Sequence, residues 1–232
     1  IFLTGATGFL GAHVLCELLL MEENVRLLRR PSSTLTELEN IIQFKLNKSL
    51  SDYNSHIEWI EGDIRDLDTL DRALKGVKLV IHCAATVSFS KKEVERLNQI
   101  NVEGTANIVN ACILNKVDKL VHVSSTSALS SFNNGRDIDE SCDYTREEKN
   151  SRYGIRKYLA EMEVWRGIEE GLDAAILNPS IILGYGNWEK GSCKLFQQYA
   201  NGFPFYSTGS NAFVGVDDVS KLIVLLSKSN VS

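Results

Sequence analysis

Residues Ile1–Gly11 read IFLTGATGFLG and run directly into the apolar pattern of Ala12–Met21. Three apolar residues, three evenly spaced glycines and a helical periodicity predict a strand, a tight turn and a helix. Such a turn suits a dinucleotide, because Gly5 lets the chain leave the strand sharply, Gly8 has no Cβ to hold a pyrophosphate away, and Gly11 lets the helix pack closely. The helix N-terminus then offers free N–H groups to the phosphates. The residues expected to contact the cofactor at this turn are Gly5, Thr7, Gly8, Phe9, Leu10 and Gly11.

The composition is that of an ordinary globular protein of 232 residues, with 44% hydrophobic and 24% charged residues. The net charge is −5 and there is no basic tract, so neither nucleic acid nor an anionic membrane is expected as a partner. No apolar run reaches the ~18–20 residues of a membrane helix. We expect a cytoplasmic protein without a signal peptide.

Five cysteines, at positions 16, 83, 112, 142 and 193, and four histidines, at 13, 56, 82 and 122, are scattered along the chain. There is no Cys-x-x-Cys pair and no histidine at ligand spacing from a cysteine. Neither a zinc site nor a disulfide framework is therefore expected, and no residue is assigned to a metal. The histidines are expected to be structural.

Short apolar runs alternate with helical patterns along most of the chain. The strand-like runs are Val25–Arg29, Ile57–Ile60, Leu79–Ala84, Leu120–Val123 and Ala174–Leu177; the helical patterns are Ala12–Met21, Thr34–Leu46, Asp66–Leu74, Val94–Leu114 and Ser151–Glu170. This alternation predicts right-handed βαβ units, and therefore an α/β fold with a parallel sheet and helices on both faces.

The sequence Arg29-Arg30-Pro31-Ser32-Ser33 follows the second strand, where a dinucleotide fold presents the residues that read the adenosine ribose. An NAD site usually places a carboxylate here, and no Asp or Glu occurs from Val25 to Thr36. Arginines beside serine hydroxyls suit a 2′-phosphate instead, because guanidinium groups bind phosphate in a bidentate manner. Arg29, Arg30 and Ser32 are therefore assigned to NADP(H), with NAD(H) as the alternative. Solvated loop charges are the plain structural interpretation.

Two further strand ends carry candidate cofactor contacts. After the third strand, Asp63 is expected to accept a hydrogen bond from the adenine amino group and Ile64 to cover the ring, while Asp66 caps the next helix. Ala84 and Ala85 end the fourth strand, where small side chains leave room for a ligand at the carboxyl edge of the sheet. Ordinary close packing would use alanine in the same way.

A hydroxyl cluster and a helical pair carry the candidate chemistry. Ser124, Ser125 and Thr126 follow the fifth strand, and Tyr153 and Lys157 stand at i, i+4 spacing on one helix face. An adjacent ammonium stabilises phenolate and so lowers the phenol pKa from its usual value near ~10. A Tyr-x-x-x-Lys pair alone indicates no more than a surface pair, but the glycine turn and the hydroxyl cluster favour chemistry.

Taken together, these motifs resemble an extended short-chain dehydrogenase/reductase, of the family that includes nucleotide-sugar epimerases, dihydroflavonol reductases and 3β-hydroxysteroid dehydrogenases. The match covers the whole chain and also includes Asn101–Thr105 and Asn178-Pro179-Ser180. The resemblance implies a Rossmann-type, doubly wound parallel sheet. It implies an NADP-binding domain over residues 1–178 and, over residues 179–232, part of a small C-terminal substrate lobe that is here incomplete.

The resemblance also implies a role for each matching residue. Tyr153 would be the general acid/base, and Lys157 would lower its pKa and bind the ribose. Thr126, the third hydroxyl of the triplet, would polarise the substrate oxygen, with Ser125 as the alternative. Asn101 matches the asparagine that supports the lysine. Pro179 lies where the family's chain passes the nicotinamide carboxamide.

Departures from the epimerase pattern favour the reductase branch. Ser127-Ala128-Leu129 follows the hydroxyl cluster where epimerases tend to have Val-Tyr-Gly, and Val87 and Phe89 would form an apolar wall of the substrate site. The expected activity is hydride transfer between NADP(H) and a small, hydrophobic or cyclic carbonyl or alcohol. A nucleotide-sugar epimerase or dehydratase with tightly bound NAD is the alternative, and a cofactor-binding scaffold without chemistry is the third hypothesis.

Two expectations concern the outer elements. Homodimers form in this family through two helices per subunit, which the resemblance places at Val94–Leu114 and Ser151–Glu170. The last helix is expected to be capped by Asp217 or Asp218.

Overall fold

The computed structural model describes residues 1–129, 139, 151–202 and 211–231. Within these ranges six strands form one sheet in the order β3-β2-β1-β4-β5-β6, and every neighbouring pair is parallel. The strands are β1 (Phe2–Thr4), β2 (Val25–Arg29), β3 (Ile57–Glu61), β4 (Leu79–His82), β5 (Lys119–Val123) and β6 (Ala174–Leu177). The predicted parallel α/β sheet is confirmed.

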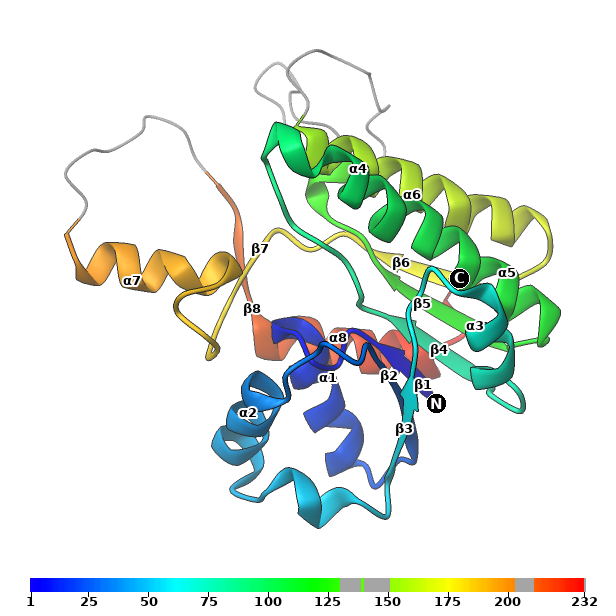
Figure 1. The fold of residues 1–232 in the computed structure, drawn as a ribbon, viewed down its shortest axis with the longest axis horizontal. Coiled ribbons are helices and arrows are strands. Elements are labelled where there is room, and N and C mark those ends of the chain that lie inside the picture. The colour runs from blue at the N-terminus through cyan, green and yellow to red at the C-terminus, as the bar shows by residue number, and fades with distance from the viewer. Residues whose placement is uncertain (130–138, 140–150, 203–210, 232) are drawn as a thin grey trace.

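Helices cover both faces of this sheet (Figure 1). They are α1 (Phe9–Leu20), α2 (Thr36–Leu46), α3 (Leu67–Ala73), α4 (Val94–Leu97), α5 (Gly104–Leu114), α6 (Arg152–Glu169) and α8 (Val216–Lys228), while α7 (Lys194–Ala200) lies away from the sheet. Side chains of α1, α2 and α8 share one hydrophobic core, and those of α3, α5 and α6 share the other. The doubly wound arrangement of the Rossmann type is therefore confirmed.

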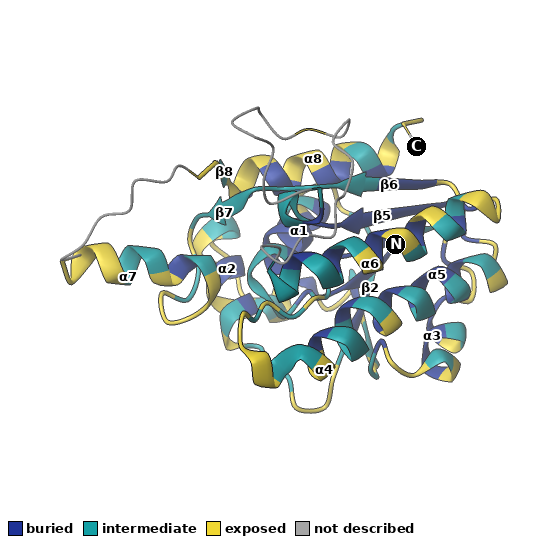
Figure 2. Cartoon of the chain, turned by 90° about the horizontal axis from the view of Figure 1, so that it is seen from above, coloured by how far each residue is buried: buried dark blue, intermediate teal, exposed yellow. Residues whose placement is uncertain are grey.

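The sheet separates the two cores because successive strand residues point to opposite faces. On β2, Leu27 is buried against α1 and α2, while Leu28 is buried in the core under α3 and α5. Figure 2 shows most of the central strands as buried. Burial on both faces explains why these strands read as nearly continuous apolar runs.

A second, two-stranded parallel sheet is formed by β7 (Ile181–Leu183) and β8 (Phe213–Gly215). It lies with α7 to one side of the main sheet, at the left of Figure 1. The chain then returns to the main domain, because Val219 and Ile223 of α8 are buried in the same core as α1. The domain boundary at residue 178 stays a prediction.

The stretch predicted as one helix from Val94 to Leu114 is helical over that whole range, but it is not α-helical throughout. A π-helical segment, Asn98–Glu103, separates α4 from α5. Its Asn101 side chain accepts a hydrogen bond from Thr86 N–H (2.8 Å) and donates one to Thr86 O (2.9 Å). This clamp on the chain after β4 comes from tertiary contacts, which helical periodicity does not contain. Widened turns of this kind are frequent at functional sites.

The two capping predictions had different outcomes. Asp66 is the N-cap of α3 and accepts hydrogen bonds from the N–H groups of Asp68 and Thr69, as predicted. By contrast, α8 begins after Gly215 without a side-chain cap, and Asp217 and Asp218 lie inside its first turn. The predicted cap of α8 was therefore wrong.

Candidate active site

The glycine turn between β1 and α1 depends on two glycines for its shape. Gly5 has φ +78°, in the left-handed region, and a Cβ there would lie 2.7 Å from the backbone nitrogen of Ala84. A Cβ on Gly11 would overlap the backbone carbonyl of Gly5. At Gly8, in contrast, a Cβ would meet only Gly5 O, at 3.4 Å. Gly5 and Gly11 thus serve the turn itself, and Gly8 leaves open space.

The start of α1 fits an anionic ligand. Its N-cap residue, Gly8, provides no side-chain hydrogen bond, and the first turn of the helix contains no acidic residue. Thr7, Phe9 and Leu10 are half-buried beside it. The N–H groups of the first turn are therefore available to a pyrophosphate, which the partial positive charge of the helix end also favours.

The arginines predicted to lie near the adenosine ribose, at the end of β2, lie outside the hydrophobic cores. The Arg29 guanidinium lies 5.2 Å above the centre of the Trp59 ring, while Arg30 and Ser32 are exposed.

Asp63, predicted to contact adenine, is held by Arg65, whose Nε and Nη2 lie 3.0 and 2.9 Å from its carboxylate oxygens. This pairing lowers the pKa of Asp63, and Arg30 adds to the effect. Ile64 is buried against α5. The adenine contacts of Asp63 and Ile64 stay predictions.

The order of the strands reverses between β1 and β4, and open α/β sheets bind their ligands at such a switch point. Ala84, half-buried, and Ala85, exposed, follow β4 at this edge. The Ala84 N–H donates to Thr4 Oγ1 (3.2 Å), so the chain after β4 is held beside the glycine turn.

A buried hydrogen-bonded series runs from this edge into α5. Thr4 Oγ1 accepts from Ala84 and donates to His82 Nδ1 (2.7 Å), because the hydrogen of the neutral ring is on Nε2. His82 Nε2–H then donates to Thr105 Oγ1 (3.1 Å), and Thr105 donates to Asn101 O (2.6 Å). His82 is thereby kept neutral, and burial lowers its pKa to about 3. Sequence reasoning treated His82 as merely structural; its position directly before the Cys83–Ala85 strand end was the available signal.

Lys157 is fully enclosed behind the strand ends. Its ammonium donates to Val123 O (2.7 Å), and burial lowers its pKa to about 8 against the opposing effect of Glu161. Tyr153 lies one turn earlier on α6. Burial raises the pKa of Tyr153 to about 12, and a hydrogen bond with the Ser125 side chain acts in the opposite direction. Lys157 is not among the groups that act on this pKa, so the expected lowering of the phenol pKa by Lys157 stays a prediction.

The structure pairs Tyr153 with Ser125 rather than with Thr126. Ser125 is the N-cap of a 3₁₀ turn, Thr126–Ala128, and its hydroxyl accepts from Ser127 N–H (3.2 Å). The Thr126 N–H donates to Pro179 O (3.1 Å), which ties the turn to the chain after β6. Of the two hydroxyls left open by the sequence, Ser125 is the one that contacts the phenol.

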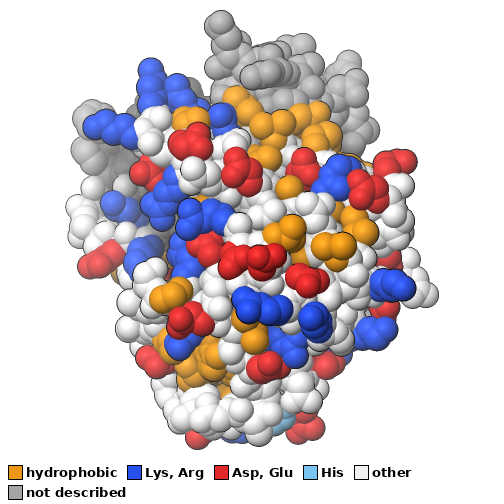
Figure 3. Space-filling model, turned by 45° about the vertical axis from the view of Figure 1, so that its right-hand side comes forward, with side chains coloured by type: hydrophobic (Ala, Val, Ile, Leu, Met, Phe, Trp, Pro, Cys, Tyr) orange, Lys and Arg blue, Asp and Glu red, His pale blue; other side chains and the backbone are white. Residues whose placement is uncertain are grey.

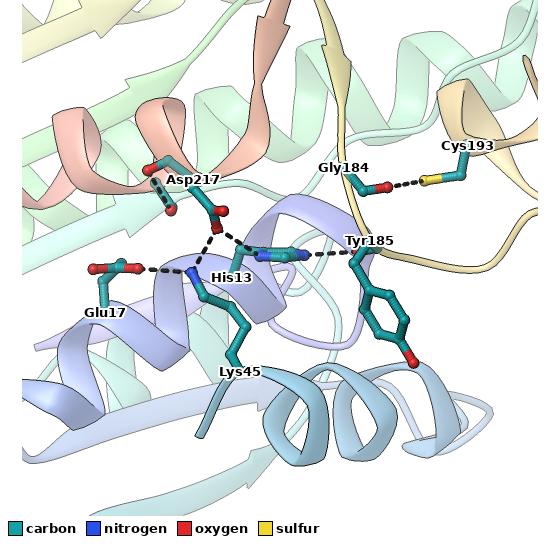
Figure 4. Close-up of polar contacts among 8 residues, drawn as sticks. His13, Glu17, Lys45, Gly184, Tyr185, Cys193 and Asp217 are labelled. Atoms are coloured by element: carbon teal, nitrogen blue, oxygen red, sulfur yellow. Dashed lines mark hydrogen bonds and ion pairs between the residues drawn. The ribbon is translucent and has the colours of Figure 1, made fainter. Parts of the chain in front are cut away.

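A second polar cluster fastens α8 and the chain after β7 to α1 and α2 (Figure 4). Lys45 Nζ donates to Glu17 Oε1 and Asp217 Oδ1, at 2.7 Å each. His13 Nε2 donates to Tyr185 O (2.8 Å), which leaves His13 Nδ1 3.6 Å from Asp217. Burial lowers the pKa of His13, and Lys45 lowers that of Asp217. The cluster thus fixes α8 and the chain after β7 to α1, the helix that follows the glycine turn.

Two absences among the described residues bear on the site. None of their helices is long and apolar enough to cross a membrane. They also contain no group of three or more His, Cys, Asp or Glu side chains placed to hold a metal ion. Cys142 lies outside the described residues.

Comparison with known proteins identifies the family. Residues 3–215 match the NAD-binding family described as male sterility protein. The chain belongs to this family. It is thus an extended short-chain dehydrogenase/reductase, and the resemblance noted in the sequence is confirmed.

Individual relatives include both reductases and epimerases. The chain is 33% identical to a putative dihydroflavonol 4-reductase of Synechocystis, over 79% of this chain and 49% of the relative. It is 30% identical to a putative UDP-glucose 4-epimerase of Methanocaldococcus jannaschii, over 95% of this chain and 71% of the relative. The crystal structure of gox2253 superimposes with a TM-score of 0.81 at 33% identity, covering 97% of this chain and 64% of that one. The chain spans about half the length of the first curated relatives it matches.

Proposed function

We propose that this chain is an NADP(H)-preferring oxidoreductase that transfers a hydride between the cofactor and a carbonyl or alcohol substrate. One observation carries the proposal: Tyr153, in contact with Ser125, and Lys157 gather at the carboxyl edge of the sheet that also carries the glycine turn. An acid/base group, a hydroxyl that can hold an oxygen and a buried ammonium are the parts that carbonyl reduction needs.

The residues of the turn fit a dinucleotide, since Gly8 leaves open space and the first turn of α1 is uncapped. The residues that would hold the cofactor are Gly5, Thr7, Gly8, Phe9, Leu10, Gly11, Arg29, Arg30, Ser32, Asp63, Ile64, Ala84, Ala85, Tyr153, Lys157 and Pro179. A bound nicotinamide would supply or accept the hydride.

The protein's own groups would handle the proton and the substrate oxygen. Because its pKa is raised, Tyr153 is protonated at neutral pH and is ready to donate to an oxygen that gains negative charge. The Ser125 hydroxyl would hold the same oxygen by a second hydrogen bond. Lys157, with a pKa of about 8, carries its charge at neutral pH and favours the phenolate left after proton transfer. Asn101 would act indirectly, through its clamp on Thr86.

The preference for NADP(H) rests on charge. Arg30 and Ser32 are exposed where a 2′-phosphate would lie, and no carboxylate occurs from Val25 to Thr36 to accept a ribose hydroxyl. Arg29, stacked on Trp59, adds a second guanidinium at the end of β2.

For the substrate we propose a hydrophobic or cyclic ketone. Val87 and Phe89 are 60% and 68% exposed on the chain after β4, and the Phe89 ring lies 6.0 Å from the Tyr153 ring. Apolar side chains that face solvent next to an acid/base group suit an apolar ligand.

The proposal is tested by calorimetric titration of the protein with NADPH and NADH separately. Clearly tighter binding of NADPH, followed by turnover of a ketone or aldehyde panel, supports it. Equal or tighter binding of NADH contradicts the cofactor preference. Binding of neither nucleotide by a folded sample contradicts the function as a whole.

The similarity to a putative UDP-glucose 4-epimerase favours one alternative, a redox-neutral epimerase or dehydratase with tightly held NAD. Release of NAD on denaturation, without net consumption of added NADPH, would identify it. A scaffold without chemistry is the third hypothesis. Wild-type activity in a Tyr153→Phe variant would remove the acid/base assignment.

We further propose a cytoplasmic homodimer formed through α5 and α6. Leu114 on α5 and Leu159, Met162 and Trp165 on α6 are large hydrophobic side chains exposed to solvent. In Figure 3, which brings the right-hand side of Figure 1 forward, hydrophobic groups lie among charged side chains of both signs. Light scattering after size exclusion tests this, with Trp165→Asp expected to give a monomer.

A further inference from the structure

A buried carboxylate stands one helical turn beyond Lys157. Glu161 is 7% exposed and Lys157 is 2% exposed, and both face the strand ends from α6. With Tyr153 they form one stripe at i, i+4 and i+8, because residues four apart lie on the same face of a helix. A glutamate is rarely buried unless it is paired, so its partners indicate what it does.

Glu161 joins the two strand ends that frame the candidate site. Its Oε2 accepts from Ser124 Oγ (2.7 Å), directly after β5, and from Asn178 Nδ2 (2.9 Å), directly after β6. Asn178 Nδ2 also lies 3.2 Å from Ser125 O. Ser125, which contacts Tyr153, is therefore linked through Asn178 to the Glu161 carboxylate. Glu161 lies on α6, the helix that also carries Tyr153.

Of the charged groups around Lys157, Glu161 has the largest effect on its pKa, which it raises. β4 and the residue directly after it contribute His82 and Cys83 to the surroundings of Lys157, β5 contributes His122, and α6 contributes Glu161. Burial keeps both histidines neutral by lowering each pKa, and raises the pKa of the Cys83 thiol to about 12. Among these neighbours Glu161 alone has a charge to offset that of Lys157.

We propose that Glu161 is a positioning residue of this site: its carboxylate balances the buried Lys157 ammonium and holds the ends of β5 and β6 against α6. Without it, a lone ammonium would be enclosed in low-dielectric surroundings, which strongly favour the neutral amine. The consequence for turnover rests on the proposed oxidoreductase function, whereas the effect on Lys157 itself does not.

A purely structural role would require only hydrogen-bond acceptors, so the variant Glu161→Gln separates the two readings. Glutamine keeps an oxygen for Ser124 and Asn178 but has no charge. The matched control is Glu163→Gln, which removes the same charge from the same helix at a site paired with Arg166 (2.9 Å). Far-UV circular dichroism and thermal melting establish that each variant is folded.

The experiment is an NMR titration of the Lys157 side chain in protein with carbon-13-labelled lysine, assigned with Lys157→Met. It uses neither cofactor nor substrate. In the wild type and in Glu163→Gln we expect titration near pH 8. In Glu161→Gln we expect it about one pH unit lower, the effect of losing the opposite charge one helical turn away. In turnover assays the alkaline limb of the pH profile should move down by the same amount.

An unchanged Lys157 titration in folded Glu161→Gln overturns the proposal, and so does a uniform loss of turnover at every pH. If Glu161→Gln does not fold, the carboxyl carbon signal of Glu161 in the wild type decides. A carboxylate signal at pH 7 supports the proposal, and a protonated carboxyl signal overturns it. Absence of any NADP-dependent turnover in the wild type would refute the proposed function while leaving the Lys157 titration to judge Glu161.

Discussion

Acidification should destabilise this fold through His82. The residue is 1% exposed, and its neutral ring accepts from Thr4 and donates to Thr105. Its pKa is about 3 in the folded chain, against 6.5 as the ordinary value. Because the folded-state pKa is the lower one, the unfolded chain binds more protons as the pH falls below 6.5, and stability is lost. Integration of this linkage from pH 7 to pH 5 gives a loss of about 2 kcal/mol from His82 alone.

The assay is urea denaturation at pH 7 and pH 5 for the wild type and for His82→Gln, whose side chain does not titrate. Lowering the pH should cost the wild type about 2 kcal/mol more than the variant. His122 has a lowered pKa as well, but it is present in both proteins and cancels in the comparison. An equal loss in the two proteins would refute the reasoning, since the proton would then not be excluded by the Thr4–His82–Thr105 series.

Three further predictions concern the cofactor and substrate residues. Gly8→Ala should keep the melting temperature but weaken dinucleotide binding in a calorimetric titration. Gly11→Ala should lose about 1–3 kcal/mol of stability or more, because its Cβ overlaps the Gly5 carbonyl. Equal stability of the two variants would contradict this prediction. Ser125→Ala should lower kcat about a hundredfold and Thr126→Val much less, measured by NADPH consumption, since Ser125 contacts the phenol; the reverse order would restore Thr126. Arg30→Ala should raise the Kd for NADPH about tenfold and leave the Kd for NADH unchanged; parallel losses for both nucleotides would dismiss the 2′-phosphate contact.

The sheet was predictable from sequence because each strand is an apolar run between turn residues. β2 and β6 have the same bounds in the structure as in the prediction, and the glycine spacing at positions 5, 8 and 11 correctly located the turn. Helical periodicity did not reveal the π-helical segment around Asn101. The Asn101 side chain is hydrogen-bonded to the backbone of Thr86, fifteen positions earlier in the chain, and a local pattern does not contain that contact.

The sequence proposed the residue types of the candidate site, but it could not give the geometry between them. Which hydroxyl faces Tyr153 depends on the 3₁₀ turn that starts at Thr126, and no local pattern fixes that turn. The pKa of Tyr153 depends on its burial, which spacing does not report. The burial of Glu161 was not predictable from the sequence, because a glutamate on a helix is usually a surface residue. Its partners Ser124 and Asn178 come from two separate strands.

One comparison of two proteins tests whether Tyr153 exchanges the proton in an NADP-dependent carbonyl reduction. Turnover of the ketone and aldehyde panel with NADPH is measured for the wild type and for Tyr153→Phe, with NADPH affinity determined on the same samples. We expect turnover by the wild type and a loss of about 10²–10⁴-fold in the variant at unchanged NADPH affinity. Equal turnover by the two proteins would contradict it.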